Sequence, residues 1–107
     1  MKQTDFAKTL TQYLTDFLPG QRNVSLNTIK SYRDTFKQYL IFIHEKQRIR
    51  PEMISLAALT VLSVRDFLHW LETSKNVGIS TRNQRLAAIH SFFRYAQTEN
   101  PEILFES

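Results

Sequence analysis

The chain has 107 residues, no cysteine, and 14 Lys plus Arg against 10 Asp plus Glu, which gives a formal net charge of +4. A chain of this length is expected to fold as one domain with its own hydrophobic core. The absence of cysteine excludes disulfides and thiolate metal sites. The positive charge favours a polyanionic partner, although many soluble proteins carry a charge of this size for solubility alone.

The N-terminal segment does not read as a targeting signal, because acidic Asp5 stands among its first residues and no long apolar run follows. No stretch approaches the roughly 18 apolar residues that a membrane span requires. The three histidines, His44, His69 and His90, stand at no helical metal-binding spacing from one another. We therefore expect a soluble, cytoplasmic protein that uses no membrane, metal site or cofactor.

Apolar residues recur every three or four positions, which predicts an all-α fold. A first helix is expected from about Thr4 to Leu18, ended by Pro19 and Gly20. A second is expected from the N-cap Ser25 to about residue 46. The first is expected to bury Phe6, Leu10, Tyr13, Leu14 and Phe17, and the second Ile29, Tyr32, Phe36, Tyr39, Leu40 and Ile43.

Residues 47–62 form the least regular stretch, with a short helical turn expected around 53–59. A third helix is predicted from a capping box of Ser63 with Asp66 to about Ser74, with Leu62 and Phe67 as a hydrophobic staple. Its expected buried stripe is Val64, Phe67, Leu68 and Leu71, with Trp70 partly buried beside it. Ile41 and Phe42 fall off the core arc of the second helix and are expected to meet the irregular stretch or another domain.

On a helical wheel, Lys30, Arg33 and Lys37 of the second helix lie within a narrow arc away from its apolar stripe. Ser31 is among the small polar residues that flank this arc. Cations for affinity with short polar side chains for register suit a helix that crosses a phosphate backbone. The alternative is an ordinary solvated face, partly neutralised by Asp34.

The fourth helix, in the run GISTRNQRLAAIHSFFRY (residues 78–95), combines a start signal with a polar, basic first turn. Ser80 or Thr81 is the expected N-cap, and the dipole at this end favours an anion. Ala87 in the middle of the open face would allow close approach to a groove. Arg82 and Arg85 either project toward a DNA backbone or lie flat over apolar surface. The expected core stripe is Leu86, Ile89, Phe93 and Ala96, which leaves Asn83, Ala87, His90, Ser91 and Arg94 on the open side.

Catalytic motifs are missing from the sequence. Neither Gly20 nor Gly78 belongs to a phosphate-cradling loop, and no serine-hydrolase or metalloprotease pattern occurs. We therefore expect that the chain alone is not an enzyme.

Three segments together resemble the N-terminal core-binding domain of phage integrases and related tyrosine recombinases. They are SLNTIKSYR (residues 25–33), VRDFLHWL (residues 64–71) and STRNQRLAAIHSFFRY (residues 80–95). The likeness covers nearly the whole chain and is best in the last segment. It implies a four-helix, SAM-like orthogonal bundle over residues 1–107, which forms a clamp around a recombination half-site with a separate catalytic domain.

In this family the second and fourth helices of the small domain face the major groove. The resemblance therefore implies DNA contacts at the residues already selected by charge. The family's tyrosine nucleophile and its partners have no match here and are expected C-terminal to residue 107. The implied partners are double-stranded DNA, that catalytic domain and other recombinase protomers. The implied DNA-binding residues are Lys30, Ser31, Arg33, Lys37, Arg82, Asn83, Arg85 and Arg94.

The leading hypothesis is a DNA-binding module of a site-specific recombinase, with its two cationic helix surfaces side by side on one duplex. An alternative is a helical protein-interaction domain whose basic face meets an acidic partner. A helix-turn-helix repressor is disfavoured, because no short helix joined by a tight turn precedes the fourth helix.

Overall fold

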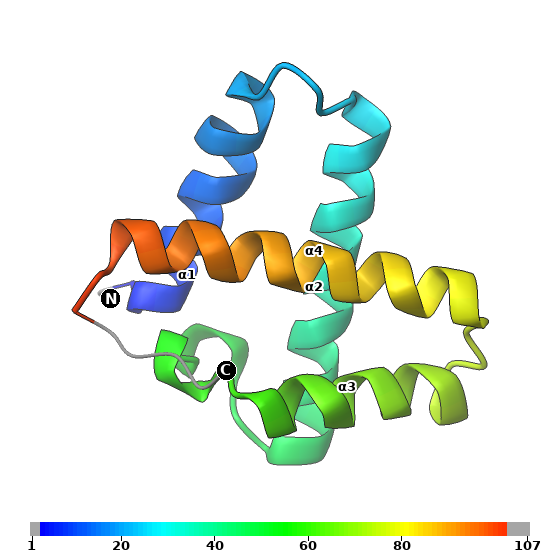
Figure 1. Cartoon of the computed structure of the whole chain (residues 1–107). Coiled ribbons are helices and arrows are strands. Elements are labelled where there is room, and N and C mark those ends of the chain that lie inside the picture. The colour runs from blue at the N-terminus through cyan, green and yellow to red at the C-terminus, as the bar shows by residue number, and fades with distance from the viewer. Residues whose placement is uncertain (1–2, 103–107) are drawn as a thin grey trace. The chain divides into compact units, whose positions relative to one another are not determined.

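The computed structural model describes residues 3–102, and every regular element in that range is helical. The four α-helices are α1 (Asp5–Gln12), α2 (Leu26–Gln47), α3 (Val61–Ser74) and α4 (Ile79–Glu99), shown in Figure 1. Short π-helical and 3-10 turns occupy parts of the connections. The prediction of an all-α protein with four helices is confirmed for the described residues.

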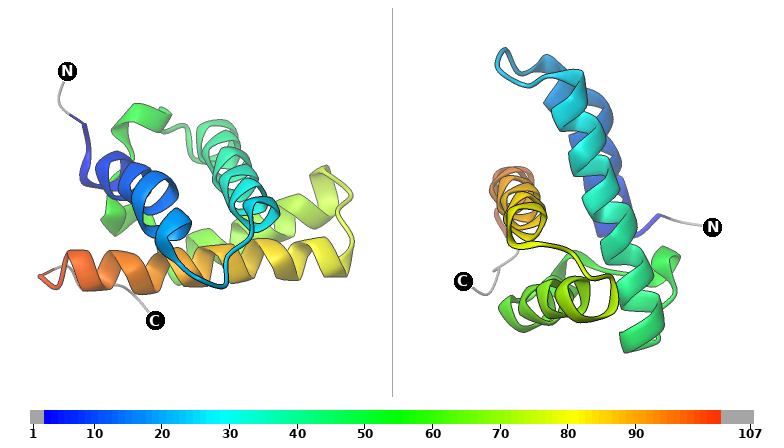
Figure 2. Two further views of the ribbon diagram at one scale, coloured as in Figure 1. Left: turned by 90° about the horizontal axis from the view of Figure 1, so that it is seen from above. Right: turned by 90° about the vertical axis from the view of Figure 1, so that its right-hand side faces the viewer.

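The chain divides after Leu56 into two compact units. The first unit contains α1 and α2, which run in opposite directions on either side of a loop at residues 21–25 (Figures 1 and 2). The second contains α3 and α4, which pack against each other as an antiparallel pair joined by residues 75–78. That the two units act as one DNA-binding domain stays a prediction from the sequence.

The first helix begins as the sequence predicts but ends less regularly. The Thr4 side chain caps α1 by accepting a hydrogen bond of 3.1 Å from the backbone N–H of Ala7. The chain then widens into the π-helical turn η1 (Tyr13–Phe17) and tightens into the 3-10 turn η2 (Leu18–Gly20). The Thr15 hydroxyl donates a hydrogen bond of 2.7 Å to the Thr11 carbonyl. A side chain that bonds to the carbonyl four residues earlier competes with the backbone hydrogen bonds of the helix and often bends it.

Helix α2 starts at the predicted cap, where Ser25 Oγ accepts from the backbone N–H of Thr28 at 3.1 Å. Phe42 was expected off the core arc, but its side chain is buried and its ring lies 6.2 Å from that of Tyr39, so that part of the prediction was wrong. The buried side of α2 is wider than the stripe of aliphatic and aromatic residues predicted from the sequence, because it also includes Thr35. Of the predicted core, Ile29, Phe36, Tyr39 and Ile43 are buried, and Tyr32 and Leu40 are half-buried.

The irregular stretch contains two 3-10 turns, η3 (Pro51–Met53) and η4 (Leu56–Ala58). Its backbone is tied to the start of α1, since Asp5 Oδ1 accepts a hydrogen bond of 2.8 Å from the N–H of Leu56. The Leu56 side chain is fully buried. This segment is therefore fixed by tertiary contacts more than by its own helical propensity.

Helix α3 begins two residues before the predicted cap. Thr60 is the N-cap, and its hydroxyl accepts from the N–H of Ser63 at 3.1 Å, so the predicted cap at Ser63 was wrong. The predicted staple was also wrong, because Leu62 is 53% exposed. Val61 and Leu62 supply the first turn without contributing to the core, whereas Phe67 is fully buried. The predicted stripe Val64, Phe67, Leu68 and Leu71 is buried, and Trp70 is more deeply buried than expected.

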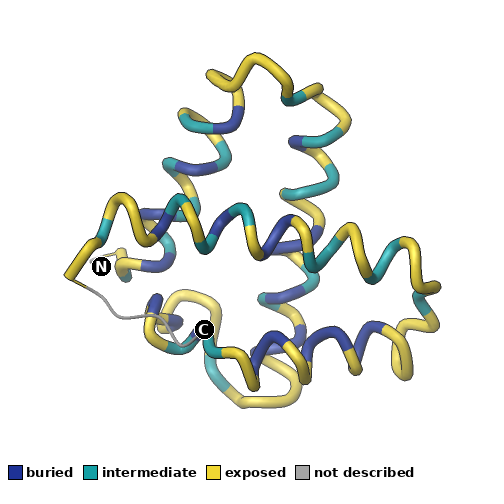
Figure 3. Tube along the Cα trace, in the orientation of Figure 1, coloured by how far each residue is buried: buried dark blue, intermediate teal, exposed yellow. Residues whose placement is uncertain are grey.

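Helix α4 begins at Ile79 with Gly78 as its N-cap, so neither Ser80 nor Thr81 is the cap. Glycine is acceptable at this position, where its extended backbone lets its carbonyl accept from Arg82 N–H at 2.9 Å. The buried side of α4 shares Ile89 and Ala96 with the predicted stripe but is rotated away from Leu86 and Phe93; Figure 3 shows the burial along the helix. Ala88, Ile89, Phe92 and Ala96 are buried, whereas Leu86 and Phe93 are half-buried.

Candidate nucleic-acid interface

The exposed side of α2 carries a row of cations. Lys30, Arg33 and Lys37 are exposed and follow one line along the helix at 100° per residue; we call these three residues the α2 ridge. At about 1.5 Å of rise per residue, the ridge extends about 10 Å along the helix axis. Ser31 lies half-buried beside it. The first unit therefore places all four of its predicted site residues on one helix.

Two apolar residues lie on the same side of α2 as the ridge. Leu26, in the first turn, is 77% exposed, and Ile41 lies one turn beyond Lys37 and is exposed. The exposed position of Ile41 agrees with the sequence expectation that it lies off the core. Leu26 was not selected from the sequence, although at 100° per residue it falls on the same line of α2 as the ridge. Along α2, the ridge is thus flanked by one exposed apolar residue on each side.

Helix α4 presents a polar surface of a different kind in the second unit. Asn83 and Arg94 are exposed, as are Ala87 and His90 between them. The open side therefore agrees with the helical wheel except at Ser91, which is half-buried, and Ala87 is the small residue at its centre. Asn83 and Arg94 are eleven residues apart, which corresponds to about 16 Å along the helix. Of these two, only Asn83 lies in the first turns, near the positive end of the helix dipole.

Arg82 and Arg85 are both half-buried. Nε of Arg82 contacts Oε1 of Glu72 in α3, and this Nε atom is shielded from solvent. Among the described residues it has no well-aligned hydrogen-bond acceptor, so the contact is an ion pair more than a directional hydrogen bond. The sequence left open whether Arg82 projects outward or lies flat. Its guanidinium instead bridges α3 and α4.

A second contact of Arg82 reaches along its own helix. Its Nη1 donates a hydrogen bond of 3.1 Å to Oδ1 of the neighbouring Asn83. Glu72 was not selected from the sequence, because it stands ten positions earlier and belongs to no motif. Only the antiparallel pairing of α3 with α4 brings its carboxylate to Arg82.

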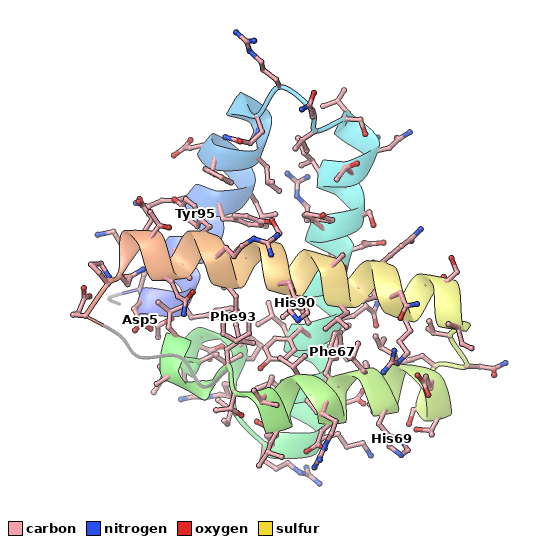
Figure 4. The ribbon with its side chains drawn as sticks, viewed as in Figure 1. Asp5, Phe67, His69, His90, Phe93 and Tyr95 are labelled. Carbon is pink, nitrogen blue, oxygen red and sulfur yellow. The ribbon has the colours of Figure 1, made fainter. Side chains whose placement is uncertain are left out.

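The histidines do not form a metal centre within residues 3–102, where no group of three or more His, Asp or Glu side chains is close enough to hold an ion. In Figure 4, His69 lies on the side of α3 opposite Phe67, which faces α4. His90 lies on α4 and is exposed. Within the same residues, no helix combines the length and the apolar character that crossing a membrane requires.

The chain was compared with known proteins. The family model described as phage integrase, N-terminal SAM-like domain, matches residues 10–100. The putative integrase/recombinase y4rC of Sinorhizobium fredii is 40% identical over 101 residues, which cover 94% of this chain and 30% of that protein. The putative integrase/recombinase y4rD of the same organism is 37% identical over 95 residues, covering 89% of this chain and 34% of that protein.

A more distant relative is the tyrosine recombinase XerC of Rhodospirillum centenum, which is 30% identical over 80 residues, or 75% of this chain and 23% of that protein. The chain thus spans about a third of the length of these relatives or less. No solved structure matches it. The family match extends over α2, α3 and α4 and most of the segment before them, so the chain belongs to the family of phage integrase N-terminal SAM-like domains.

Proposed function

We propose that this chain is the DNA-binding module of a site-specific tyrosine recombinase and that it grips a recombination half-site through the major groove. The observation that carries the proposal is the α2 ridge of Lys30, Arg33 and Lys37. Exposed cations at intervals of three and four residues suit a row of phosphates, and the exposed Asp34, one turn after Lys30, offsets only part of their charge. The names of the relatives, two of them integrase/recombinases, support the same assignment.

The proposed contacts divide into two groups. Lys30, Arg33 and Lys37 neutralise phosphates, and Ser31 helps to fix the register of α2 on the backbone. On α4, Asn83 and Arg94 are the exposed polar groups that reach DNA, and Ala87 allows that helix to approach the groove. Arg82 and Arg85 are half-buried beside this open side, and Arg82 is paired with Glu72 of α3, so we assign the two arginines a smaller part in the contact.

The proposal extends to the whole recombinase of which this chain would be one part. Strand cleavage and rejoining are assigned to a catalytic domain of the same polypeptide, C-terminal to this one, and other protomers bind the second half-site. Both units of this chain then contact one duplex, the first through the α2 ridge and the second through the first turns of α4. The 107-residue chain alone should bind duplex DNA weakly, because it supplies only part of that clamp.

The test measures how the affinity of the 107-residue chain for a fluorescein-labelled duplex of about 20 base pairs depends on salt. Each phosphate contact contributes about 0.9 to the slope of log K against log salt concentration. Lys30→Gln and Lys37→Gln should each lower the magnitude of that slope by about 0.9. Lys46→Gln is the matched control, because Lys46 is exposed on the same helix, outside the ridge.

Equal slopes for wild type, the ridge variants and Lys46→Gln would contradict the proposal. Loss of binding to an acidic protein, with unchanged DNA binding, would instead favour the protein-interaction alternative. Circular dichroism of each variant controls for folding, and no change is expected, since the three lysines are exposed.

A further inference from the structure

We propose that Glu72 is a positioning residue for DNA recognition: it holds Arg82, and Arg82 in turn orients Asn83 so that the Asn83 amide offers a hydrogen-bond donor to the DNA. The inference rests on the proposed function and names the chemistry of one part of that site. It also changes the role of Arg82, which acts through its neighbour instead of neutralising a phosphate.

The first step is the placement of Arg82. Its Nε is shielded from solvent against Oε1 of Glu72, and the two side chains are 33% and 42% exposed. The carboxylate compensates the guanidinium charge where the two helices meet. A cation that is neutralised within the protein and only one-third exposed releases few counterions on binding DNA.

The second step is the orientation of the Asn83 amide. Arg82 Nη1 lies 3.1 Å from Asn83 Oδ1. A guanidinium has only donors, so the amide atom that faces it must be the carbonyl oxygen. This fixes the amide rotamer on chemical grounds, and Nδ2 with its two N–H donors is directed away from Arg82. Asn83 is exposed, so these donors are available to a ligand.

The third step is what such a group recognises. An asparagine reads adenine with both amide atoms, donating to N7 and accepting from N6. Here one lone pair of Oδ1 is already engaged by Arg82. The remaining Nδ2 donors fit hydrogen-bond acceptors: the N7 and O6 atoms on a guanine edge, or phosphate oxygens. Glu72 therefore biases Asn83 toward acceptors and away from the paired adenine contact.

The first experiment needs no DNA. Side-chain amide signals of Asn83 are recorded by ¹⁵N NMR in wild type, Glu72→Gln and Arg82→Gln. Both variants should shift the Asn83 Nδ2 signals in the same direction, and the signals of Asn27, on α2, should stay in place. If Glu72→Gln leaves the Asn83 signals unchanged, the positioning role is refuted. The variants should remain folded, because a partly exposed ion pair contributes little to stability.

The second experiment uses the labelled duplex and its salt dependence. Arg82→Gln should leave the slope unchanged, whereas Glu72→Gln should steepen it by about 0.9 as the released guanidinium reaches a phosphate. A slope that falls by about 0.9 in Arg82→Gln would make Arg82 a direct phosphate contact and would overturn the inference.

Asn83→Ala distinguishes the two acceptor sources. A loss of affinity that is equal on duplexes of different sequence indicates phosphate oxygens, and a loss confined to guanine-containing duplexes indicates base edges. A loss confined to adenine-rich duplexes would contradict the proposed orientation. If wild type fails to bind any duplex, the proposed function fails, and the NMR experiment still decides whether Glu72 orients Asn83.

Discussion

The carboxylate of Asp5 accepts a hydrogen bond of 2.8 Å from the backbone N–H of Leu56, a residue 51 positions later in the chain. The same oxygen accepts from the N–H of Phe6 at 2.7 Å, at the start of α1. One side chain thus stabilises the positive end of α1 and holds the irregular stretch at Leu56, the first residue of η4.

Removing this carboxylate should destabilise the protein. Asp5→Ala leaves the Leu56 N–H without its acceptor, and we expect the free energy of unfolding to fall by about 2 kcal/mol. Asp5→Asn keeps an oxygen acceptor but no charge, so its free energy of unfolding should fall by less. Urea denaturation measures both, with Asp16→Ala as the control, because Asp16 is exposed and its recorded bond is a long one, 3.4 Å, to Thr15. Equal losses in Asp5→Ala and Asp16→Ala would contradict this account.

The cap of α3 gives a second stability prediction. Thr60→Ala should cost about 1 kcal/mol, the usual loss when an N-cap hydroxyl is removed. Ser80→Ala should cost close to nothing, because Ser80 is exposed within the first turn of α4 and is not its cap. Thermal unfolding of the two variants compares them directly. A larger loss of stability for Ser80→Ala would contradict this and would support Ser80 as the N-cap of α4.

Arg48 ends α2 in the left-handed conformation with φ of 58°, which is costly for a residue with a Cβ atom. Arg48→Gly should raise the free energy of unfolding by about 0.5–1 kcal/mol. Asn76, in the loop before α4, has φ of 54°, but asparagine tolerates this conformation. Asn76→Gly should therefore raise the free energy of unfolding by less than Arg48→Gly does. If chemical denaturation shows no gain for Arg48→Gly, the strain at this position is compensated elsewhere.

Ala87 connects the shape of α4 to its proposed role. It is exposed in the middle of the polar side, so Ala87→Leu should leave stability nearly unchanged but prevent close approach to a groove. We expect binding of the labelled duplex to weaken about tenfold, which corresponds to about 1.4 kcal/mol. Ala57→Leu adds the same bulk at an exposed position outside α4 and should have little effect. Unchanged affinity in Ala87→Leu would place this side of α4 outside the interface.

Sequence periodicity was sufficient to predict the four helices and the α2 ridge, because the spacing of apolar residues determines which side of a helix is buried. Periodicity failed at the helix ends and at the edges of the buried sides, where a single residue determines the outcome. The spacing of Ser63 and Asp66 fits a capping box, but the helix begins earlier, at the cap Thr60. Phe42 was misplaced because the edge of a buried arc depends on what packs against it. The Glu72 contact with Arg82 joins two helices and leaves no periodic signal.

The most direct test of the proposed DNA-binding surfaces is a titration of the isotopically labelled chain with duplex DNA, followed by the backbone amide signals. We expect the perturbed amides to cluster on residues 30–37 of α2 and in the first turns of α4. Perturbations confined to Ile41, Phe42 and α3 would contradict this expectation and would indicate a protein-docking surface instead.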